Sequence, residues 1–321
     1  MTIRQITVFG GSGFVGRAIV QALAREGYMI RVAVRRLGPA NPVKSFGDVG
    51  QINLVQANLR MPASVTAAVQ GSDAVVNAAG IPFQRGRQTY QAVHAEGARN
   101  IAQACASTGI QRLVHISGIG ADNRSSSNAY LKSKVAAEDA VIAGFTSATI
   151  LRPSVVFGPN DALFTRMASI ACTAPFVPLV GDGSAKVQPV FSADVGRAVV
   201  AVLQRPDTAR TVFELGGPQV YSYREIAKLV LLQVDRQKPI IGVPAPLMRI
   251  AGFFAQQIGR FGLMPPITAD QVELMLHDNV VRPGANTFAT LGIEPAAPEA
   301  ILPTYLDRFR VGGRYNQHAP A

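Results

Sequence analysis

The sequence of 321 residues has no tryptophan, only two cysteines and four histidines, and few charged side chains. Charged residues make up 16% of the chain, whereas about 25% is usual for a soluble protein. Cys105 and Cys172 lie outside any C-x-x-C spacing, which excludes a disulfide framework and a cysteine-based metal site. The histidines are not spaced as ligands either, so we expect no metal.

Long apolar runs are also absent. No run approaches the roughly 18 residues that a membrane-spanning helix needs, and no signal-peptide pattern precedes the first expected strand. The free cysteines suit a reducing, cytoplasm-like compartment. We therefore expect a cytoplasmic protein that is soluble or peripheral to a membrane.

What the chain does contain is apolar side chains and arginine. Hydrophobic residues make up 48% of the chain, which is enough to bury a core and excludes disorder. Lys and Arg number 31 against 20 Asp and Glu, a formal charge of +11, and only six of the cations are lysine. Because the arginines are scattered along the sequence rather than clustered, we expect no nucleic-acid partner.

Apolar segments alternate with helical patterns along the first two thirds of the chain. The expected strands are Ile6–Phe9, Ile30–Val34, Asn53–Val55, Ala74–Asn77, Arg112–Ile116, Thr149–Leu151 and Val212–Leu215. Helical patterns cover Phe14–Arg25, Gln91–Ala106, Ala129–Ala143, Ala193–Leu203, Tyr223–Val234 and Leu247–Phe261. Such strands, apolar throughout, are typical of a parallel sheet covered on both faces. The pattern predicts an α/β fold with a Rossmann-type, doubly wound parallel sheet and a smaller mixed C-terminal lobe.

The expected domain limits follow from this alternation. We expect a nucleotide-binding domain over residues 1–155, with elements around 187–215 returning to it. A mixed lobe for a substrate or partner is expected over 156–311, and residues 312–321 form a loose polar tail.

A glycine-rich turn lies between the first expected strand and the first helix. It contains Gly10, Gly13 and Gly16, with Ser12, Phe14 and Val15 between them. Glycines at these positions permit a tight turn and close approach of the backbone to a pyrophosphate, which the free N–H groups of the helix bind. The alternative is an ordinary tight turn. Its place in a βαβ unit favours dinucleotide binding.

The second expected strand ends in Arg35 and Arg36, where sites specific for NAD usually have an acidic residue on the ribose 2′-OH. Arginine there can bind a 2′-phosphate, so NADP(H) is favoured over NAD(H). The alternative is a pair of solvated surface arginines.

Tyr130 and Lys134 are four residues apart at the start of an expected helix, so they share one face. A fixed cation beside a phenol favours its phenolate form, which suits acid–base catalysis. The lysine can also hydrogen-bond the cofactor ribose. Tyr130 and Lys134 are therefore candidates for both catalysis and cofactor binding.

Several motifs together resemble the extended short-chain dehydrogenases/reductases, which include NAD-dependent epimerases and dehydratases. They are Gly10-x-x-Gly13-x-x-Gly16, Asn77-Ala-Ala-Gly80, Tyr130-x-x-x-Lys134 and Arg152-Pro-x-x-Val-Phe-Gly158-Pro. Later segments resemble one atypical branch, the dehydrogenase-like nucleotide-binding accessory subunits of respiratory complex I and their bacterial relatives. These segments are Phe213–Pro218, Tyr221–Glu225, Asp270–Leu274, Asp278–Val281, Ile301–Tyr305 and Arg308–Arg310. This second resemblance covers nearly the whole chain.

The resemblance implies a role for each matching position. Gly10, Gly13 and Gly16 would hold the pyrophosphate, and Arg35 or Arg36 the 2′-phosphate. Asn58 and Leu59 would border the adenine, and Lys134 would hold the nicotinamide ribose. The remaining expected contacts are Ala78, Ala79 and Gly80 along the ribose, and Pro153, Val155 and Val156 beside the nicotinamide.

The resemblance also implies partners and a location. The mitochondrial family member binds NADPH tightly in a structural role and lies on the peripheral arm of complex I, close to the membrane. The implied partners are peripheral-arm subunits. The implied location is the cytoplasmic face of the inner membrane, or the matrix side in a mitochondrion.

The sequence departs from the active enzymes at one position. They carry a Ser or Thr after the fifth strand that donates a hydrogen bond to the substrate oxygen, and here that position is Ile119. Losing one such donor lowers rates by about 10²–10³-fold, although Ser117 is a candidate substitute. An accessory or assembly subunit is therefore favoured. The alternatives are an active reductase, epimerase or dehydratase acting on a nucleotide-sugar or an isoprenoid- or quinone-related substrate, and a sensor of the NADPH/NADP⁺ ratio.

One later segment has a pattern of its own. Apolar residues recur at helical spacing over Leu247–Phe261, with arginines as the only cations. Such a helix docks a partner or lies on a membrane surface with anionic lipid headgroups. The alternative is a helix in the core of the second lobe.

Overall fold

The computed structural model describes residues 3–259, 267–310 and 312–313 and divides the chain into two compact units. The first comprises Met1–Pro153, Ser192–Leu215 and Val281–Glu294, and the second comprises Ser154–Phe191, Gly216–Val280 and Pro295–Ala321. This division differs from the expected limits in two respects. Residues 154–155 and 187–191 belong to the second unit, and Val281–Glu294 packs with the first unit because it runs along the last strand of the sheet. Most of the expected tail, residues 314–321, lies outside the described residues.

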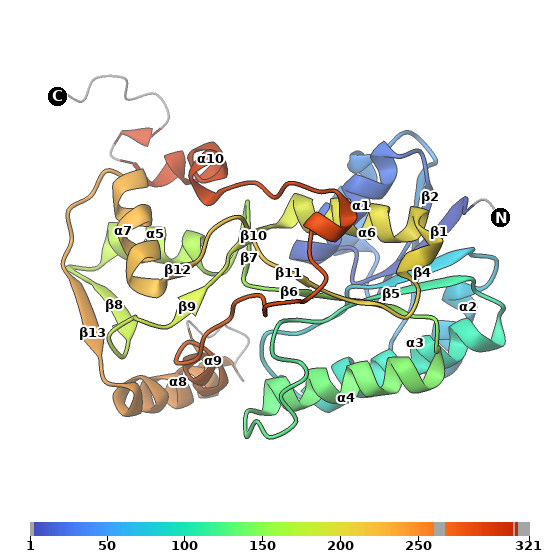
Figure 1. The fold of residues 1–321 in the computed structure, drawn as a ribbon, viewed down its shortest axis with the longest axis horizontal. Helices are drawn as coiled ribbons and strands as arrows, with labels where there is room; N and C mark the ends of the chain where they lie inside the picture. Colours follow the sequence, from blue (N-terminus) through green and yellow to red (C-terminus); the bar gives the residue numbers. More distant parts are fainter. Residues whose placement is uncertain (1–2, 260–266, 311, 314–321) are drawn as a thin grey trace. The chain divides into compact units, whose positions relative to one another are not determined.

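The first unit is built on a parallel sheet (Figure 1). Within the described residues, its seven strands follow the order β11-β6-β5-β4-β1-β2-β3. The strands are β1 (Gln5–Phe9), β2 (Met29–Val34), β3 (Ile52–Gln56), β4 (Ala74–Asn77), β5 (Arg112–Ile116), β6 (Thr149–Pro153) and β11 (Val212–Leu215). The order reverses beside β1, and in sheets of this kind ligands bind at the carboxyl ends of the strands at that point. The predicted doubly wound sheet is confirmed.

Helices cover both faces of this sheet (Figure 1). The helices α1 (Phe14–Arg25) and α6 (Ser192–Gln204) pack together on one face, where a Cβ on Gly196 would lie 2.8 Å from the carbonyl oxygen of Ala18. The other face carries α2 (Pro62–Val69), α3 (Glu96–Ser107) and α4 (Ala129–Gly144). Short helical turns add η1 (Gly38–Phe46), η2 (Gln91–Ala95), η3 (Pro206–Thr208) and η4 (Ala289–Leu291). A buried apolar core that includes Phe9, Ile101 and Leu113 joins the sheet to α2, α3 and α4.

The second unit is smaller and mixed. Its short strands pair as β7 (Val156–Phe157) with β10 (Val190–Phe191), β8 (Val177–Val180) with β13 (Ile240–Val243), and β9 (Lys186–Val187) with β12 (Tyr221–Ser222). Its helices are α5 (Phe164–Thr173), α7 (Tyr223–Gln233), α8 (Ala245–Gly259), α9 (Ala269–Leu274), α10 (Pro298–Ile301) and α11 (Pro303–Leu306), followed by the turn η5 (Asp307–Phe309). Its core packs Phe157, Phe164 and Val187 against Ile226 and Leu306.

Local sequence explains where several helices begin. The Asn128 side chain accepts hydrogen bonds from the N–H groups of Tyr130 and Leu131, so α4 begins just before Tyr130. Ser222 and Glu225 form a capping box at the start of α7. None of the described helices combines the length and apolarity that crossing a bilayer requires.

Candidate dinucleotide-binding site

The glycine turn has the geometry of a pyrophosphate cradle. Gly10 follows β1 directly and has a φ of +76°, which favours glycine. A Cβ on Gly10 would lie 2.6 Å from the carbonyl oxygen of Ala78, and a Cβ on Gly16 would overlap the carbonyl oxygen of Gly10. Gly13 caps α1 without a side-chain hydrogen bond, and the first turn of α1 has no acidic residue. The N–H groups of Phe14 and Val15 lie in the first turn of α1, where a helix offers them no carbonyl partner, so they are suited to an anion.

Three arginines gather beside the end of β2. Burial lowers the pKa of Arg35, and the charges of Arg36 and Arg60 lower it further. None of the three has an ion-pair partner among the residues that the structure describes. Arg60 is not among the predicted site residues, although it directly follows Leu59 in an expected binding segment. An unpaired group of guanidinium charges suits a phosphate.

Two hydrogen bonds hold the segment that contains Asn58 and Leu59, which follows β3. The Asn58 side-chain oxygen accepts a hydrogen bond from the Arg60 N–H at 3.1 Å. The side-chain amide of Asn100, on α3, donates to the carbonyl oxygen of Leu59 at 2.7 Å. Both bonds hold the segment as a turn at the carboxyl end of the sheet, where Leu59 is half-buried.

The end of β4 contacts the glycine turn and continues into the segment from Ala78 to Gly80. The Asn77 side-chain oxygen accepts from the Ala79 N–H at 3.1 Å, and its amide nitrogen lies 3.0 Å from Nδ1 of His115. The amide therefore donates to Nδ1, which places the proton of His115 on Nε2. Burial, and then the charge of Lys134, lower the pKa of His115 to about 3, so the ring is neutral.

The residues of the expected catalytic group lie on α4 and at the end of β5. The Lys134 Nζ lies 5.8 Å from the Tyr130 ring centroid and donates a long hydrogen bond of 3.5 Å to the Ile116 carbonyl oxygen. Ser117 follows Ile116 and is buried, and Ile119 has a buried apolar side chain. The structure thus pairs Tyr130 with Lys134.

Two buried polar atoms in this part of the site have no hydrogen-bond partner among the residues that the structure describes. They are Nε2 of His115 and Oγ of Ser117, and both residues are less than 10% exposed. The residue Lys134 is 7% exposed, and its ammonium group makes only one long hydrogen bond within the described residues. Such donors require an acceptor. Together with the glycine cradle, they fit a dinucleotide whose ribose hydroxyls and phosphates are acceptors.

A dinucleotide would use these residues at separate points. The glycine turn would hold its pyrophosphate, the arginines a 2′-phosphate, and Lys134 a ribose, while a bound nicotinamide would supply a hydride donor or acceptor. Pro153 ends β6, and its carbonyl oxygen accepts from the Ile119 N–H at 3.1 Å. Val155 and Val156 belong to the second unit. Their expected place beside the nicotinamide stays a prediction.

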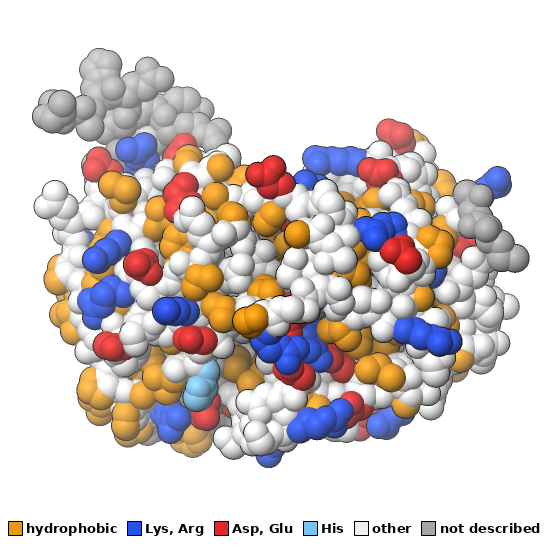
Figure 2. Space-filling model, viewed as in Figure 1, with side chains coloured by type: hydrophobic (Ala, Val, Ile, Leu, Met, Phe, Trp, Pro, Cys, Tyr) orange, Lys and Arg blue, Asp and Glu red, His pale blue; other side chains and the backbone are white. Residues whose placement is uncertain are grey.

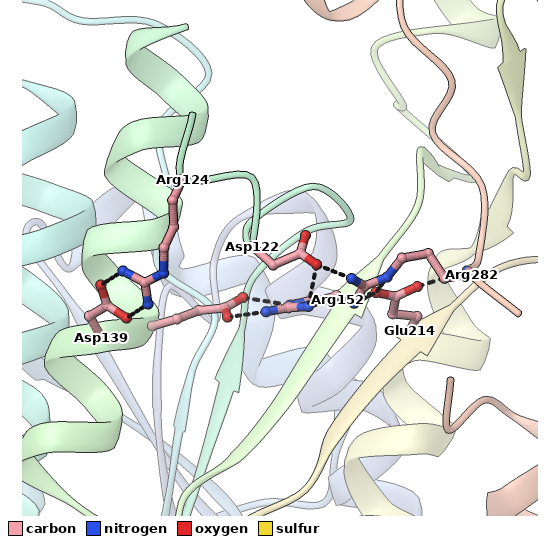
Figure 3. Close-up of polar contacts among 7 residues, drawn as sticks. Asp122, Arg124, Asp139, Arg152, Glu214 and Arg282 are labelled. Carbon is pink, nitrogen blue, oxygen red and sulfur yellow. Dashed lines mark hydrogen bonds and ion pairs between the residues drawn. The ribbon is translucent and has the colours of Figure 1, made fainter. Parts of the chain in front are cut away.

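A network of ion pairs centred on the buried Arg152 supports the helix that carries Tyr130 and Lys134 (Figure 3). Glu138, one turn after Lys134, accepts two hydrogen bonds from Arg152 at 2.9 and 2.6 Å. Arg152 also lies 3.6 Å from Asp122 and from Glu214. Arg282 donates to Glu214 at 2.6 Å and pairs with Asp122. Burial alone would lower the pKa of Arg152, but the hydrogen bonds and charge of Glu138 raise it.

Comparisons with known proteins agree with this geometry. The pattern of the "NAD dependent epimerase/dehydratase family" matches residues 6–216. The chain is 33% identical over 312 residues to the "NADH-ubiquinone oxidoreductase 40 kDa subunit, mitochondrial" of Neurospora crassa, covering 97% of this chain and 80% of that protein. It is 31% identical to the mouse "NADH dehydrogenase [ubiquinone] 1 alpha subcomplex subunit 9, mitochondrial", covering 95% of this chain and 80% of that protein.

A solved structure has the same fold. UDP-glucuronic acid 4-epimerase from Bacillus cereus, in complex with UDP-glucuronic acid and NAD, superposes with a TM-score of 0.70 at 17% identity, over 95% of this chain and 98% of that one. The chain belongs to the NAD dependent epimerase/dehydratase family, and its homologues include the complex I subunits of Neurospora and mouse.

Proposed function

We propose that this protein is an accessory or assembly subunit of respiratory complex I that holds NADP(H) as part of its structure. The similarity to a complex I subunit over 97% of the chain is the observation that carries the proposal. Two features of the site support it: the glycine turn leads into helical N–H groups that suit an anion, and the residue at the position expected for the catalytic donor is the buried, apolar Ile119. A ligand that binds only the folded state stabilises it in proportion to the logarithm of its concentration.

The proposed partners are subunits of the peripheral arm at the membrane surface. Helix α8 exposes Leu247, Ile250 and Phe253 by 58%, 55% and 55%. Figure 2 shows hydrophobic side chains in this region, whereas basic and acidic side chains are interspersed on the same face. These three side chains are not core, so we assign this face of α8 to a partner subunit, with anionic lipid headgroups as the other candidate. The expected end of this helix at Phe261 lies outside the described residues.

Native isolation tests the proposed function. We expect the tagged chain, extracted gently from membranes, to co-purify with complex I subunits and to release NADP(H) on denaturation. Mass spectrometry identifies the proteins, and chromatography of the released nucleotide identifies the cofactor. Fully assembled, normal complex I in a strain that lacks the chain would contradict the proposal.

The group of Arg35, Arg36 and Arg60 supports NADP(H) rather than NAD(H). Changing Arg60→Gln removes one guanidinium charge from the group, so we expect NADPH to bind about tenfold more weakly and NADH to bind as before. Isothermal titration calorimetry measures both. Arg25→Gln, at the exposed far end of α1, is the matched control and leaves both affinities unchanged. Equal weakening of NADPH and NADH would show that Arg60 does not contact a 2′-phosphate.

The second candidate function is an active reductase, epimerase or dehydratase. The observation that favours it is the retained pair of Tyr130 and Lys134, with the lysine over the ring. Tyr130 would exchange a proton with the substrate oxygen, and Ser117 would donate the hydrogen bond that Ile119 cannot. Turnover of a carbonyl substrate by the wild type that Tyr130→Phe abolishes would favour this function over a structural one.

A further inference from the structure

A π-helical turn precedes α3, and one side chain within it and one directly before it contact Tyr130 of α4. In η2 (Gln91–Ala95) the N–H of Glu96 donates to the carbonyl oxygen of Gln91, five residues back. Such turns are rare and occur frequently at functional sites. His94 lies within the turn and is 3% exposed, and Tyr90 lies directly before it.

Both ring nitrogens of His94 are hydrogen-bonded. Nε2 lies 3.0 Å from the backbone N–H of Ile81, which can only donate, so Nε2 accepts. In a neutral imidazole the other nitrogen then carries the proton. Nδ1 therefore donates to Oγ of Ser133 at 2.8 Å, and that hydroxyl donates to the carbonyl oxygen of Tyr130 at 2.6 Å. The chain of hydrogen bonds has one direction.

This chain of hydrogen bonds joins two segments of the dinucleotide site. Ile81 directly follows Ala78–Gly80, and Tyr130 lies in the first turn of α4, four residues before Lys134. Ring contacts also connect these segments. The His94 ring stacks on the Tyr90 ring with centroids 5.4 Å apart, and it meets the Tyr130 ring edge-on with centroids 5.5 Å apart. The Tyr90 hydroxyl donates to the carbonyl oxygen of Pro82 at 3.1 Å, which holds the same segment from a second side.

The surroundings keep His94 neutral. Burial lowers its pKa to about 3, and the charge of Lys134 acts in the same direction. A protonated ring would present an N–H to the N–H of Ile81, and the chain would break at that point. The tautomer with its proton on Nδ1 is therefore the form that fits these contacts.

We propose that His94 is a positioning residue of the dinucleotide site, a neutral imidazole that ties the segment after β4 to the first turn of α4. Its two hydrogen bonds set Tyr130 and Lys134 relative to Ala78–Gly80, so that they meet the nicotinamide half of the ligand. This inference rests on the proposed function, because it assigns part of the same site.

Two variants that keep the hydrogen bond to Ile81 and lose the one to position 133 test this link. Ser133→Ala breaks the path to the Tyr130 carbonyl and keeps the bond to Ile81, while His94→Gln keeps an acceptor for Ile81 and loses the bond to Ser133. We expect each to weaken NADPH about tenfold, as one lost hydrogen bond would. Binding of 2′,5′-ADP, which lacks the nicotinamide half, should stay within twofold. Calorimetry on the full chain measures both ligands.

Ser107→Ala is the matched control. Its hydroxyl also donates to a carbonyl three residues back, that of Ala104, at 3.1 Å, but near the end of α3 rather than in the site. It should change neither affinity. Equal weakening of NADPH and 2′,5′-ADP by Ser133→Ala, or no weakening at all, would overturn the inference.

A spectroscopic measurement tests the hydrogen-bond direction without a ligand. Long-range ¹H–¹⁵N correlation spectra of the histidine-labelled chain should show the His94 proton on Nδ1, with no titration between pH 5 and 8. A proton on Nε2, or titration in this range, would overturn the inference. Failure of the wild type to bind NADPH and 2′,5′-ADP would refute the proposed function, and the spectra would still decide the state of His94.

Discussion

Aspartate in place of Gly13 is expected to remove dinucleotide binding while the chain stays folded. Gly13 caps α1, and aspartate is among the preferred residues at that position, because its carboxylate accepts from the helix N–H groups. The same carboxylate would occupy the place of the pyrophosphate and repel it. Two like charges about 4 Å apart repel by about 4 kcal/mol near a protein surface. We therefore expect affinity for NADPH to fall by at least about 100-fold.

Calorimetry and thermal unfolding check this result together. NADPH at about 100 times its Kd should stabilise the wild type by about 2.7 kcal/mol, whereas Gly13→Asp should gain nothing from the nucleotide. Gly13→Asn is the matched control, since it has the same shape and capping ability without the charge. If the Asn and Asp variants bind NADPH equally well, the anion does not lie at the start of α1.

Methionine in place of Arg152 is expected to cost more stability than any surface change. Arg152 has a side chain only 9% exposed and pairs with Glu138 and Glu214, which are 5% and 2% exposed. Methionine fills a similar volume but leaves both carboxylates without this partner. Removing one member of a buried ion pair lowers the free energy of unfolding by about 3–5 kcal/mol. Urea denaturation followed by circular dichroism measures the loss.

Arg124→Met provides the comparison within the same region. Arg124 pairs with Asp139, which lies on the same helix as Glu138 (Figure 3). The side chains of Arg124 and Asp139 are 71% and 47% exposed. An exposed pair contributes little, because water already solvates both charges, so this variant should unfold almost as the wild type does. Similar losses in the free energy of unfolding for Arg124→Met and Arg152→Met would show that burial does not determine how much these ion pairs stabilise the protein.

The sheet and the glycine turn could be predicted because their signals are local. Apolar runs such as Ile6–Phe9 and Ala74–Asn77 are followed within a few residues by glycine or helical patterns, and the structure has strands at both places. The helix expected over Gln91–Ala106 was only partly right. Its first turn is the π-helical η2, since side-chain periodicity does not show which carbonyl a backbone N–H selects. Helices α2 and α5 were missed in segments rich in Pro, Gly, Ser and Thr.

The contacts that complete the site join residues far apart in sequence. Arg282 reaches Glu214 across 68 positions, and Ser133 reaches His94 across 39. Nothing in the local pattern around His94 distinguishes a hydrogen-bonded positioning residue from an ordinary core histidine. Arg60 could not be predicted for the same reason, because Arg35 and Arg36 follow β2 whereas Arg60 follows β3. Composition and spacing thus predict elements and turns, whereas side-chain partners depend on how those elements meet.

The segment Val281–Glu294 has a consequence for any shortened form of the protein. It lies along β11, where the Glu214 N–H donates to the carbonyl oxygen of Asn286 at 2.8 Å and Arg282 neutralises the Glu214 carboxylate. A fragment cut at residue 216, where the family match ends, would lose both. Its last strand would present unpaired backbone groups to other molecules, and such an open edge promotes self-association. The first unit thus depends on residues that follow β11 by more than 60 positions.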